Sequence, residues 1–207
     1  MIRFTLLFFA LWLTPSLLLA VDLPLAPEAV KPLPSGTRAP TPELISADGS
    51  ACDLSRLFRE KPTVLIFYRG GWCPFCNRHL AALAECELPL RQMGYQIIAV
   101  TPEAPPKLKS TAKENRVRYR LLSDRAMLAA GAYGVAFRVS VETGQDYQRN
   151  GIELPVAPDG LGFWQPVPAA FIISREGIVR FVYSNPDPEN AISVNELLRA
   201  AKAAAKD

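Results

Sequence analysis

Two cysteines three residues apart, Cys73 and Cys76, directly follow a run of apolar β-branched and aromatic residues at positions 63–68. Such a run is typical of a buried strand, and leucines recur at helical spacing after the cysteine pair. The pattern predicts a strand, a short loop and a helix that begins at the pair. Because positions three apart at a helix start share one face, the two sulfurs can close a small ring.

The expected helix start favours the chemistry of thiolates. Free backbone N–H groups and the positive end of the helix dipole stabilise a thiolate over a thiol. Pro74 suits the first helical turn, where its missing N–H has no consequence. A thiolate attacks disulfides and peroxides, so Cys73 and Cys76 are the candidate catalytic residues and their disulfide the expected redox group. No further cofactor is expected, and with one histidine and no second Cys pair a tetrahedral zinc site lacks ligands.

Length and charge narrow the class of protein. The chain has 207 residues, of which 49% are hydrophobic, and this suits one globular domain with an N-terminal extension. Its net charge of +3 is too small to indicate a nucleic-acid partner. The expected partners are small-molecule or protein thiols and disulfides, hydroperoxides, and a thiol reductant of unknown identity.

Residues 1–20 resemble a secretory signal peptide. Arg3 precedes an apolar segment that Pro15 interrupts, and Ala20 is the small residue that cleavage requires. We therefore expect a periplasmic or secreted protein, cleaved after Ala20. The alternative is a membrane anchor formed by residues 4–20, although the apolar run is shorter than the ~20 residues of a spanning helix.

The two remaining cysteines, Cys52 and Cys86, allow two interpretations. In an oxidising compartment they would form a structural disulfide separate from the Cys73–Cys76 pair. Alternatively, both are buried free thiols. Sequence alone leaves these two interpretations open.

The rest of the chain alternates between strand and helix patterns. Residues 21–42 form a proline-rich lead-in, and a domain at 43–207 follows, with an irregular insertion at about 139–167. Within this domain, Asp48-Gly49 predicts a hairpin turn, Asp53 or Ser55 a helix cap, and Pro89 a kink or end of the helix after the cysteines. Further strands are expected at 95–100, 119–122, 169–174 and 178–183, and further helices at 107–115, 125–132 and 189–206.

This order predicts an α/β protein with a thioredoxin-like fold, a central mixed β-sheet flanked by helices on both faces. Val167 and Pro168 come directly before a predicted strand. In thioredoxin-like proteins a cis-proline at this place faces the cysteine pair, and Pro168 resembles it. The plainer interpretation is a proline admitted at the first residue of a strand.

Three segments carry a resemblance to a known family. The segment 67–77, with the sequence FYRGGWCPFCN, together with VPAAFII at 167–173 and GIVRF at 177–181, resembles the peroxiredoxin-like branch of the alkyl-hydroperoxide-reductase/thiol-specific-antioxidant superfamily. The resemblance spans roughly residues 41–183. It implies a thiol-dependent oxidoreductase or antioxidant.

The chain departs from the peroxiredoxin pattern Pro-x-x-x-Thr/Ser-x-x-Cys. Aligned on the preceding strand, Cys76 takes the peroxidatic position, Arg69 replaces the proline and Cys73 replaces the Thr or Ser. Pro168 stands where an arginine is often found. Aligned on Trp72, the segment instead resembles thioredoxin, with Cys73 as the exposed attacking thiol.

The leading hypothesis is an exported thiol–disulfide oxidoreductase in which Cys73 attacks and Cys76 releases the mixed disulfide. Trp72, Pro74, Val167, Pro168 and Arg69 would form the substrate site, and Arg69 would also stabilise the thiolate. His79 is interpreted as an exposed helix residue.

Two alternatives remain. One is a thiol peroxidase, in which Cys76 or Cys73 becomes a sulfenic acid and condenses with its partner. The other is a non-catalytic redox sensor or binding module that docks partners through Tyr147, Phe163 and Trp164. A lid packed over the sheet is the plainer interpretation of these three aromatic residues.

Overall fold

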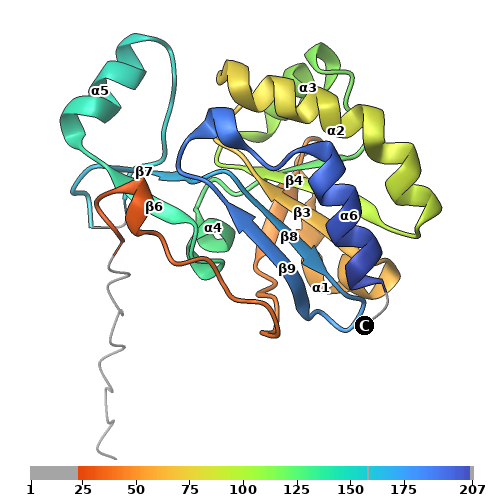
Figure 1. Ribbon diagram of the computed structural model, residues 1–207. Helices are drawn as coiled ribbons and strands as arrows, with labels where there is room; N and C mark the ends of the chain where they lie inside the picture. The colour runs from red at the N-terminus through yellow and green to blue at the C-terminus, as the bar shows by residue number, and fades with distance from the viewer. Residues whose placement is uncertain (1–22, 158, 206–207) are drawn as a thin grey trace, which may run out of the picture.

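A computed structural model describes residues 23–157 and 159–205 (Figure 1). The predicted signal peptide lies outside these ranges. The strands are β1 Glu43–Ser46, β2 Ala51–Asp53, β3 Thr63–Phe67, β4 Gln96–Thr101, β5 Arg120–Ser123, β6 Ala136–Val139, β7 Phe163–Pro166, β8 Ala169–Ile173 and β9 Val179–Ser184. The helices are α1 Leu54–Glu60, α2 Pro74–Gln92, α3 Pro105–Glu114, α4 Leu128–Ala132, α5 Val141–Arg149 and α6 Val194–Ala204, with 3₁₀ turns η1 Pro27–Ala29 and η2 Pro188–Asn190.

Seven strands form the main sheet in the order β2-β1-β5-β4-β3-β8-β9. The strands β3, β4 and β5 run parallel, and their neighbours pair antiparallel. Every residue of β3 and β8 is buried, because helices cover both faces of the sheet. The predicted fold, a mixed sheet between helices, is therefore confirmed.

The alternation of side chains along β3 divides the core into two layers. Leu65 and Phe67 belong to the layer that α1 and α4 cover. Val64 and Ile66 belong to the opposite layer, which α2, α3 and α6 cover. Successive residues of a strand point to opposite faces, so a continuous apolar run supplies both layers. In Figure 1 α2, α3 and α6 lie together on one side of the sheet.

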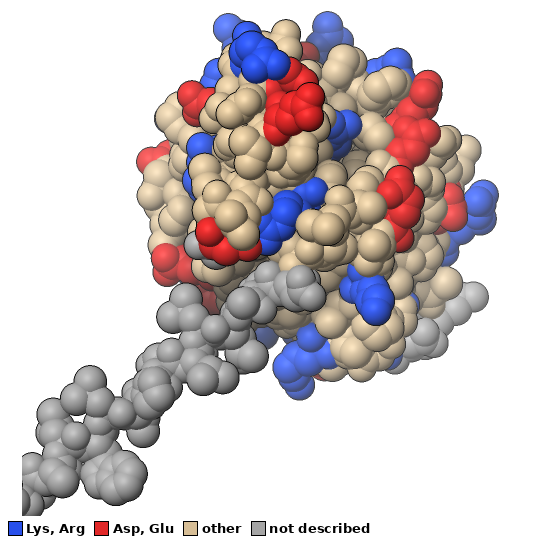
Figure 2. All heavy atoms as spheres, turned by 90° about the vertical axis from the view of Figure 1, so that its left-hand side faces the viewer, with Lys and Arg blue, Asp and Glu red and all other residues tan. Residues whose placement is uncertain are grey.

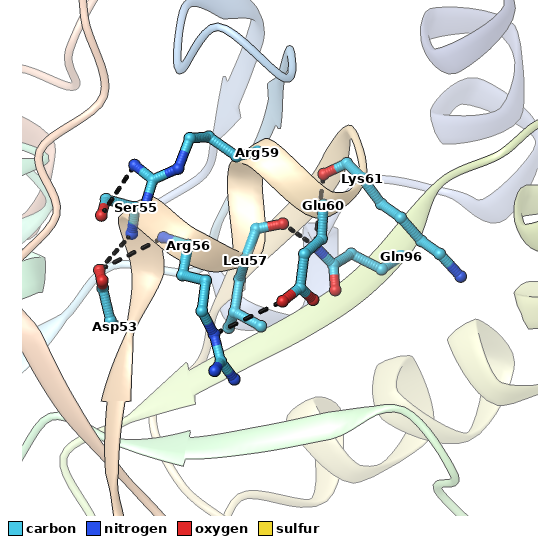
Figure 3. Close-up of polar contacts among 8 residues, drawn as sticks. All are labelled: Asp53, Ser55, Arg56, Leu57, Arg59, Glu60, Lys61 and Gln96. Carbon is cyan, nitrogen blue, oxygen red and sulfur yellow. Dashed lines mark hydrogen bonds and ion pairs between the residues drawn. The ribbon is translucent and has the colours of Figure 1, made fainter.

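Polar contacts fix both ends of α1, as Figure 3 shows. The Asp53 carboxylate accepts hydrogen bonds from the N–H groups of Ser55 and Arg56, which confirms the predicted cap. At the other end the Gln96 side chain donates to the carbonyl of Leu57 at 2.6 Å. These contacts hold α1 to the start of β4, whereas the exposed Arg56–Glu60 ion pair at 3.4 Å contributes little.

The segment after β6 is more regular than the sequence predicted. It contains α5 and β7, and β7 pairs with β6 in a separate two-stranded sheet. Gly144 of α5 lies against the ring of Phe163, where a Cβ atom would overlap the ring. We call residues 136–167 the insertion unit; Figure 1 shows it beside one end of the main sheet.

The proline-rich lead-in packs along the domain. Leu23 and Ala39 are buried in the α1 layer of the core. Backbone hydrogen bonds join Gly36 N–H to the Val179 carbonyl at 2.7 Å and Arg138 N–H to the Pro24 carbonyl at 2.8 Å. The lead-in therefore connects the main sheet to the insertion unit.

Several predicted boundaries shift. Of the two outcomes expected at Pro89, a kink or an end of the helix, the end is wrong: α2 continues to Gln92, with Leu90 fully buried. The helices α4 and α6 begin three and five residues later than predicted, and the side chains of Asp124 and Ser193 accept hydrogen bonds from their first turns. Within the described ranges no helix is both long and apolar enough to cross a membrane.

The structure distinguishes the two interpretations that the sequence left open for Cys52 and Cys86. Both residues are buried free thiols, the second of these interpretations, and they form no disulfide with each other. Cys52 lies in the core layer under α1, and Cys86 lies on α2 in the opposite layer. The sheet separates them, and a disulfide requires Cα atoms within about 7 Å.

Candidate active site

The cysteine pair lies at the start of α2, as predicted. Cys73 is the N-cap residue in an extended conformation, and Pro74 is the first helical residue. The Cys73 N–H donates to the Gly70 carbonyl at 3.1 Å, and the Cys73 carbonyl accepts from Asn77 N–H at 3.0 Å. The loop after β3 thus leads into the N-terminus of α2, where the N–H groups of Phe75 and Cys76 lie near the sulfur of Cys73.

The two thiols have opposite electrostatic environments. The pKa of Cys73 is lowered, first by hydrogen bonding from the Cys76 thiol, and also by the N–H groups of Cys76 and Phe75 and the charge of Arg69. The pKa of Cys76 is raised, first by the same hydrogen bond and also by burial and the neighbouring Cys73. The surroundings therefore favour the thiolate on Cys73 and the proton on Cys76.

Both thiols are enclosed, with Cys73 at 1% and Cys76 at 4% exposure. The expected exposure of Cys73 is wrong, because Trp72 packs against the cluster that contains both cysteines. A small oxidant or a movement of this cover is needed to reach the sulfur.

Glu103, in the loop after β4, holds the loop before the cysteines. Its carboxylate accepts from Gly71 N–H at 2.7 Å, and the Asn77 side chain donates to the Gly71 carbonyl at 2.7 Å. Burial raises the pKa of Glu103. A Cβ on Gly71 would overlap Thr111 of α3, so the close approach requires glycine. The sequence analysis missed Glu103, which is 32 residues from Gly71 along the chain.

Arg69 links the cysteine loop to the insertion unit. Its guanidinium lies 4.8 Å from the ring centroid of Trp72 and donates to the Tyr147 hydroxyl at 2.5 Å and to Gln165 Oε1 at 3.1 Å. The rings of Trp72 and Tyr147 lie 5.3 Å apart. Tyr147 of α5 therefore covers the residue that precedes Cys73, as a lid would.

A cavity of about 420 Å³ lies beside Arg69, and Val167 and Pro168 line it. Trp72 lines a second cavity of about 410 Å³ on the side of Glu103. Pro74 is exposed and lines neither cavity. Of the predicted substrate residues, the structure thus brings Arg69, Val167 and Pro168 together, with Trp72 adjoining Arg69.

Pro168 differs from the proline that it resembles. The described residues contain no cis peptide bond, so the bond before Pro168 is trans. Pro168 directly precedes β8, where a missing N–H is tolerated. The structure therefore agrees with the plainer interpretation, an ordinary proline at the start of a strand.

Phe163, Trp164 and His79, which the sequence analysis also considered, pack within the protein. Phe163 and Trp164 are 8% and 6% exposed, and Trp164 Nε1 donates to the Val156 carbonyl at 2.8 Å. They form no docking surface. His79 is half-buried, and burial lowers its pKa, so the expected exposed position is wrong.

Comparison with known proteins identifies the family. Residues 35–182, well over half of the chain, match the AhpC/TSA family. The chain belongs to the AhpC/TSA family. It is 24% identical over 158 residues to the chloroplastic peroxiredoxin Q of Populus jackii, which covers 76% of this chain and 63% of that relative. It is 28% identical over 106 residues to the putative peroxiredoxin bcp of Haemophilus influenzae. This match covers 51% of this chain and 68% of that relative.

Two solved structures share the fold. Peroxidoxin BcpB of Mycobacterium tuberculosis superposes with a TM-score of 0.65 at 20% identity, over 82% of this chain and 96% of that one. Reduced Prx3 of Vibrio vulnificus in complex with H₂O₂ superposes with a TM-score of 0.66 at 18% identity, over 82% of this chain and 99% of that one. These matches support the thioredoxin-like, peroxiredoxin-like architecture. The chain spans under two thirds of the length of the Populus jackii relative.

Proposed function

We propose that this protein is a thiol-dependent peroxidase that reduces hydroperoxides with the Cys73–Cys76 pair. The observation that carries the proposal is a buried cysteine pair at a helix start, where the pKa of Cys73 is lowered and the pKa of Cys76 is raised. The relatives named peroxiredoxin Q and peroxiredoxin bcp favour this activity over the disulfide exchange that the sequence analysis ranked first.

In the first step the Cys73 thiolate attacks the terminal oxygen of the hydroperoxide. The O–O bond breaks, its terminal OH passes to the sulfur, and Cys73 becomes a sulfenic acid. The leaving alkoxide or hydroxide takes a proton from solvent and departs as alcohol or water. The lowered pKa of Cys73 supplies the thiolate near neutral pH. Arg69 contributes positive charge that stabilises the thiolate before attack.

In the second step the sulfur of Cys76 attacks the sulfenic sulfur of Cys73. The S–O bond breaks, the hydroxide takes the Cys76 proton and leaves as water, and the Cys73–Cys76 disulfide forms. The pKa of Cys76 is raised first by its hydrogen bond to the Cys73 thiolate. Once Cys73 is a sulfenic acid that thiolate is gone, so the Cys76 thiol can release its proton to the leaving hydroxide as its sulfur attacks. Two thiols of an external reductant then restore the dithiol and leave as a disulfide.

Disulfide exchange is the second candidate. The low pKa of Cys73 serves attack on a disulfide as well as on a peroxide. However, the burial of Cys73 at 1% exposure favours a small substrate over a protein disulfide.

We also propose that the protein is exported, since residues 1–20 have the pattern of a signal peptide. Cell fractionation and N-terminal sequencing test this. We expect a mature chain that begins at Val21 outside the cytoplasm; a full-length chain in the membrane fraction would instead support the anchor.

Mass mapping tests the chemistry. One equivalent of H₂O₂ added to the reduced protein should yield a disulfide between Cys73 and Cys76, with no change at Cys52 or Cys86. A thiol reductant should then regenerate the dithiol, with two thiols oxidised per peroxide consumed. No loss of peroxide above the buffer rate would refute the proposed activity.

A further inference from the structure

The cavity of about 420 Å³ beside Arg69 combines apolar walls with a few polar side chains. Phe137 and Val139 of β6 line it together with Val167 and Pro168. Figure 2 views the molecule from the side of the insertion unit, where acidic and basic side chains are scattered among uncharged ones. A pocket of this size and composition suits a small organic molecule with a polar head.

Arg69 brings a positive charge to this pocket, with hydrogen-bond donors that are not all used. Its bonded partners, Tyr147 and Gln165, are both neutral, and Trp72 packs on its face. Within the described ranges no carboxylate forms an ion pair with it, whereas the neighbouring Arg138 pairs with Asp159. A guanidinium carries five N–H donors, and the two bonds to Gln165 and Tyr147 leave donors for a further acceptor.

Gln165 provides an independent sign of a ligand. The side chain is 2% exposed, lines the pocket and accepts from Arg69 through Oε1. Because Arg69 can only donate, this bond fixes the orientation of the amide. The amide nitrogen, Nε2, is then buried without an acceptor in the described part of the chain. Buried donors are almost always paired, so this nitrogen lacks the acceptor that it requires.

We propose that this pocket binds the carboxylate of an organic substrate. Arg69 and Gln165 donate to the carboxylate oxygens, and the apolar walls hold the hydrocarbon part. The proposal rests on the proposed function in one respect: the ligand is a substrate of the Cys73–Cys76 pair, either the hydroperoxide or the thiol reductant. A carboxylate supplies both an anionic acceptor for the donors that Arg69 has left and the acceptor that Gln165 lacks.

Calorimetric titration tests the binding, with octanoate and the neutral octanol as probes for the reduced mature protein. We expect octanoate to bind and octanol to bind at least about tenfold more weakly, since it lacks charge-assisted hydrogen bonds. Gln165→Leu should weaken octanoate binding about 10- to 100-fold. Gln148→Leu, at an exposed position of α5, is the matched control and should leave the affinity unchanged.

A second variant guards against simple misfolding. Gln165→Glu keeps the size of the side chain, pairs with Arg69 and repels a carboxylate, so it should keep the wild-type melting temperature or raise it while losing octanoate binding. Equal affinities for octanoate and octanol, or wild-type octanoate affinity in Gln165→Leu, would overturn the proposal.

Kinetics then identify the substrate. In one arm a hydroperoxy fatty acid is compared with its methyl ester, and in the other 3-mercaptopropionate with 2-mercaptoethanol. We expect the acid to have the lower KM in one arm, and Gln165→Leu to remove the difference there. Equal KM values within both arms would refute the substrate assignment. Absence of any peroxidase turnover would refute the proposed function instead, and the calorimetric result would still decide whether the pocket binds carboxylates.

Discussion

The four cysteines lie in two kinds of surroundings that differ in electrostatics and hardly in burial. Cys73 and Cys76 at the start of α2 are 1% and 4% exposed, and Cys52 and Cys86 within the core layers are 7% and 4% exposed. Burial alone raises the pKa of a thiol, as it does for Cys52 and Cys86. Of these four thiols, only that of Cys73 has a lowered pKa.

The difference comes from what surrounds the sulfur. Cys73 accepts a hydrogen bond from the Cys76 thiol and lies near N–H groups of the first helical turn and Arg69. Cys86 lies on the same helix, but within its interior, where its thiol instead donates to the Leu83 carbonyl at 3.3 Å. The start of the helix thus lowers the pKa of Cys73 through the Cys76 thiol, the free N–H groups and Arg69, whereas the helix interior offers Cys86 none of these.

Loss of the Cys73 thiolate should have the largest effect. We expect Cys73→Ser to slow the reaction with H₂O₂ by on the order of 10³-fold or more, because no other thiol has a lowered pKa. Stopped-flow measurement of tryptophan fluorescence follows the oxidation. Cys86→Ala, the control on the same helix, should react at the wild-type rate; a similar loss there would break the contrast between the two sites.

Removal of the Cys76 donor should come next. Cys76→Ala takes away the largest cause of the lowered pKa, so the pKa of Cys73 should rise toward the ordinary cysteine value. Alkylation by iodoacetamide, measured against pH, should show a midpoint below the ordinary cysteine value in the wild type, with reactivity lost as pH falls through it. In Cys76→Ala the midpoint should move to higher pH, with about tenfold slower alkylation at pH 7.

Cys76→Ser sharpens this test because its hydroxyl still donates. Its midpoint should lie between those of the wild type and Cys76→Ala. Identical midpoints in all three proteins would show that the helix N–H groups and Arg69 alone set the pKa of Cys73.

Neutralising Arg69 should have a smaller effect. In Arg69→Met the positive charge is lost and the apolar stem kept, so alkylation at pH 7 should slow about three- to tenfold. Arg78→Met is a suitable control, because the Arg78 guanidinium packs over Phe75 at 4.8 Å and is not among the causes of the low Cys73 pKa. Equal slowing in both variants would assign the effect to general surface charge.

The core cysteines should affect stability alone. Cys52→Ala and Cys86→Ala should each lower the free energy of unfolding by about 1–2 kcal/mol, since each leaves a small cavity. Equilibrium unfolding in urea measures this loss. The loss should be the same with and without dithiothreitol, because neither thiol is bonded. A loss that appears only without reductant would indicate a disulfide and contradict the separation of the two core layers.

Sequence alone predicted the elements that local pattern determines. The apolar run of β3, the Asp53 cap and the helix start at Cys73 all follow from residues that are close in the chain. The helix α5 was missed because, apart from Gly144, none of its residues is buried, so it lacks the apolar stripe that identifies a helix.

Contacts between residues that are far apart in the chain could not be predicted from the sequence. Gln165 lies 96 residues from Arg69, and a glutamine in an insertion has no local signal of its partner. The faces of Cys52 and Cys86 also depend on how β2 and α2 pack on the sheet, which spacing does not specify.

The most direct test of the account is stopped-flow oxidation of the reduced mature protein by H₂O₂, beside Cys73→Ser and Cys76→Ser. The account predicts rapid oxidation that Cys76→Ser retains, with sulfenic acid accumulating on Cys73, and that Cys73→Ser loses. Rapid oxidation that needs Cys76 but survives in Cys73→Ser would reverse the roles of the two thiols. Slow reaction of the wild type, beside fast exchange with a disulfide that needs Cys73, would contradict the peroxidase itself.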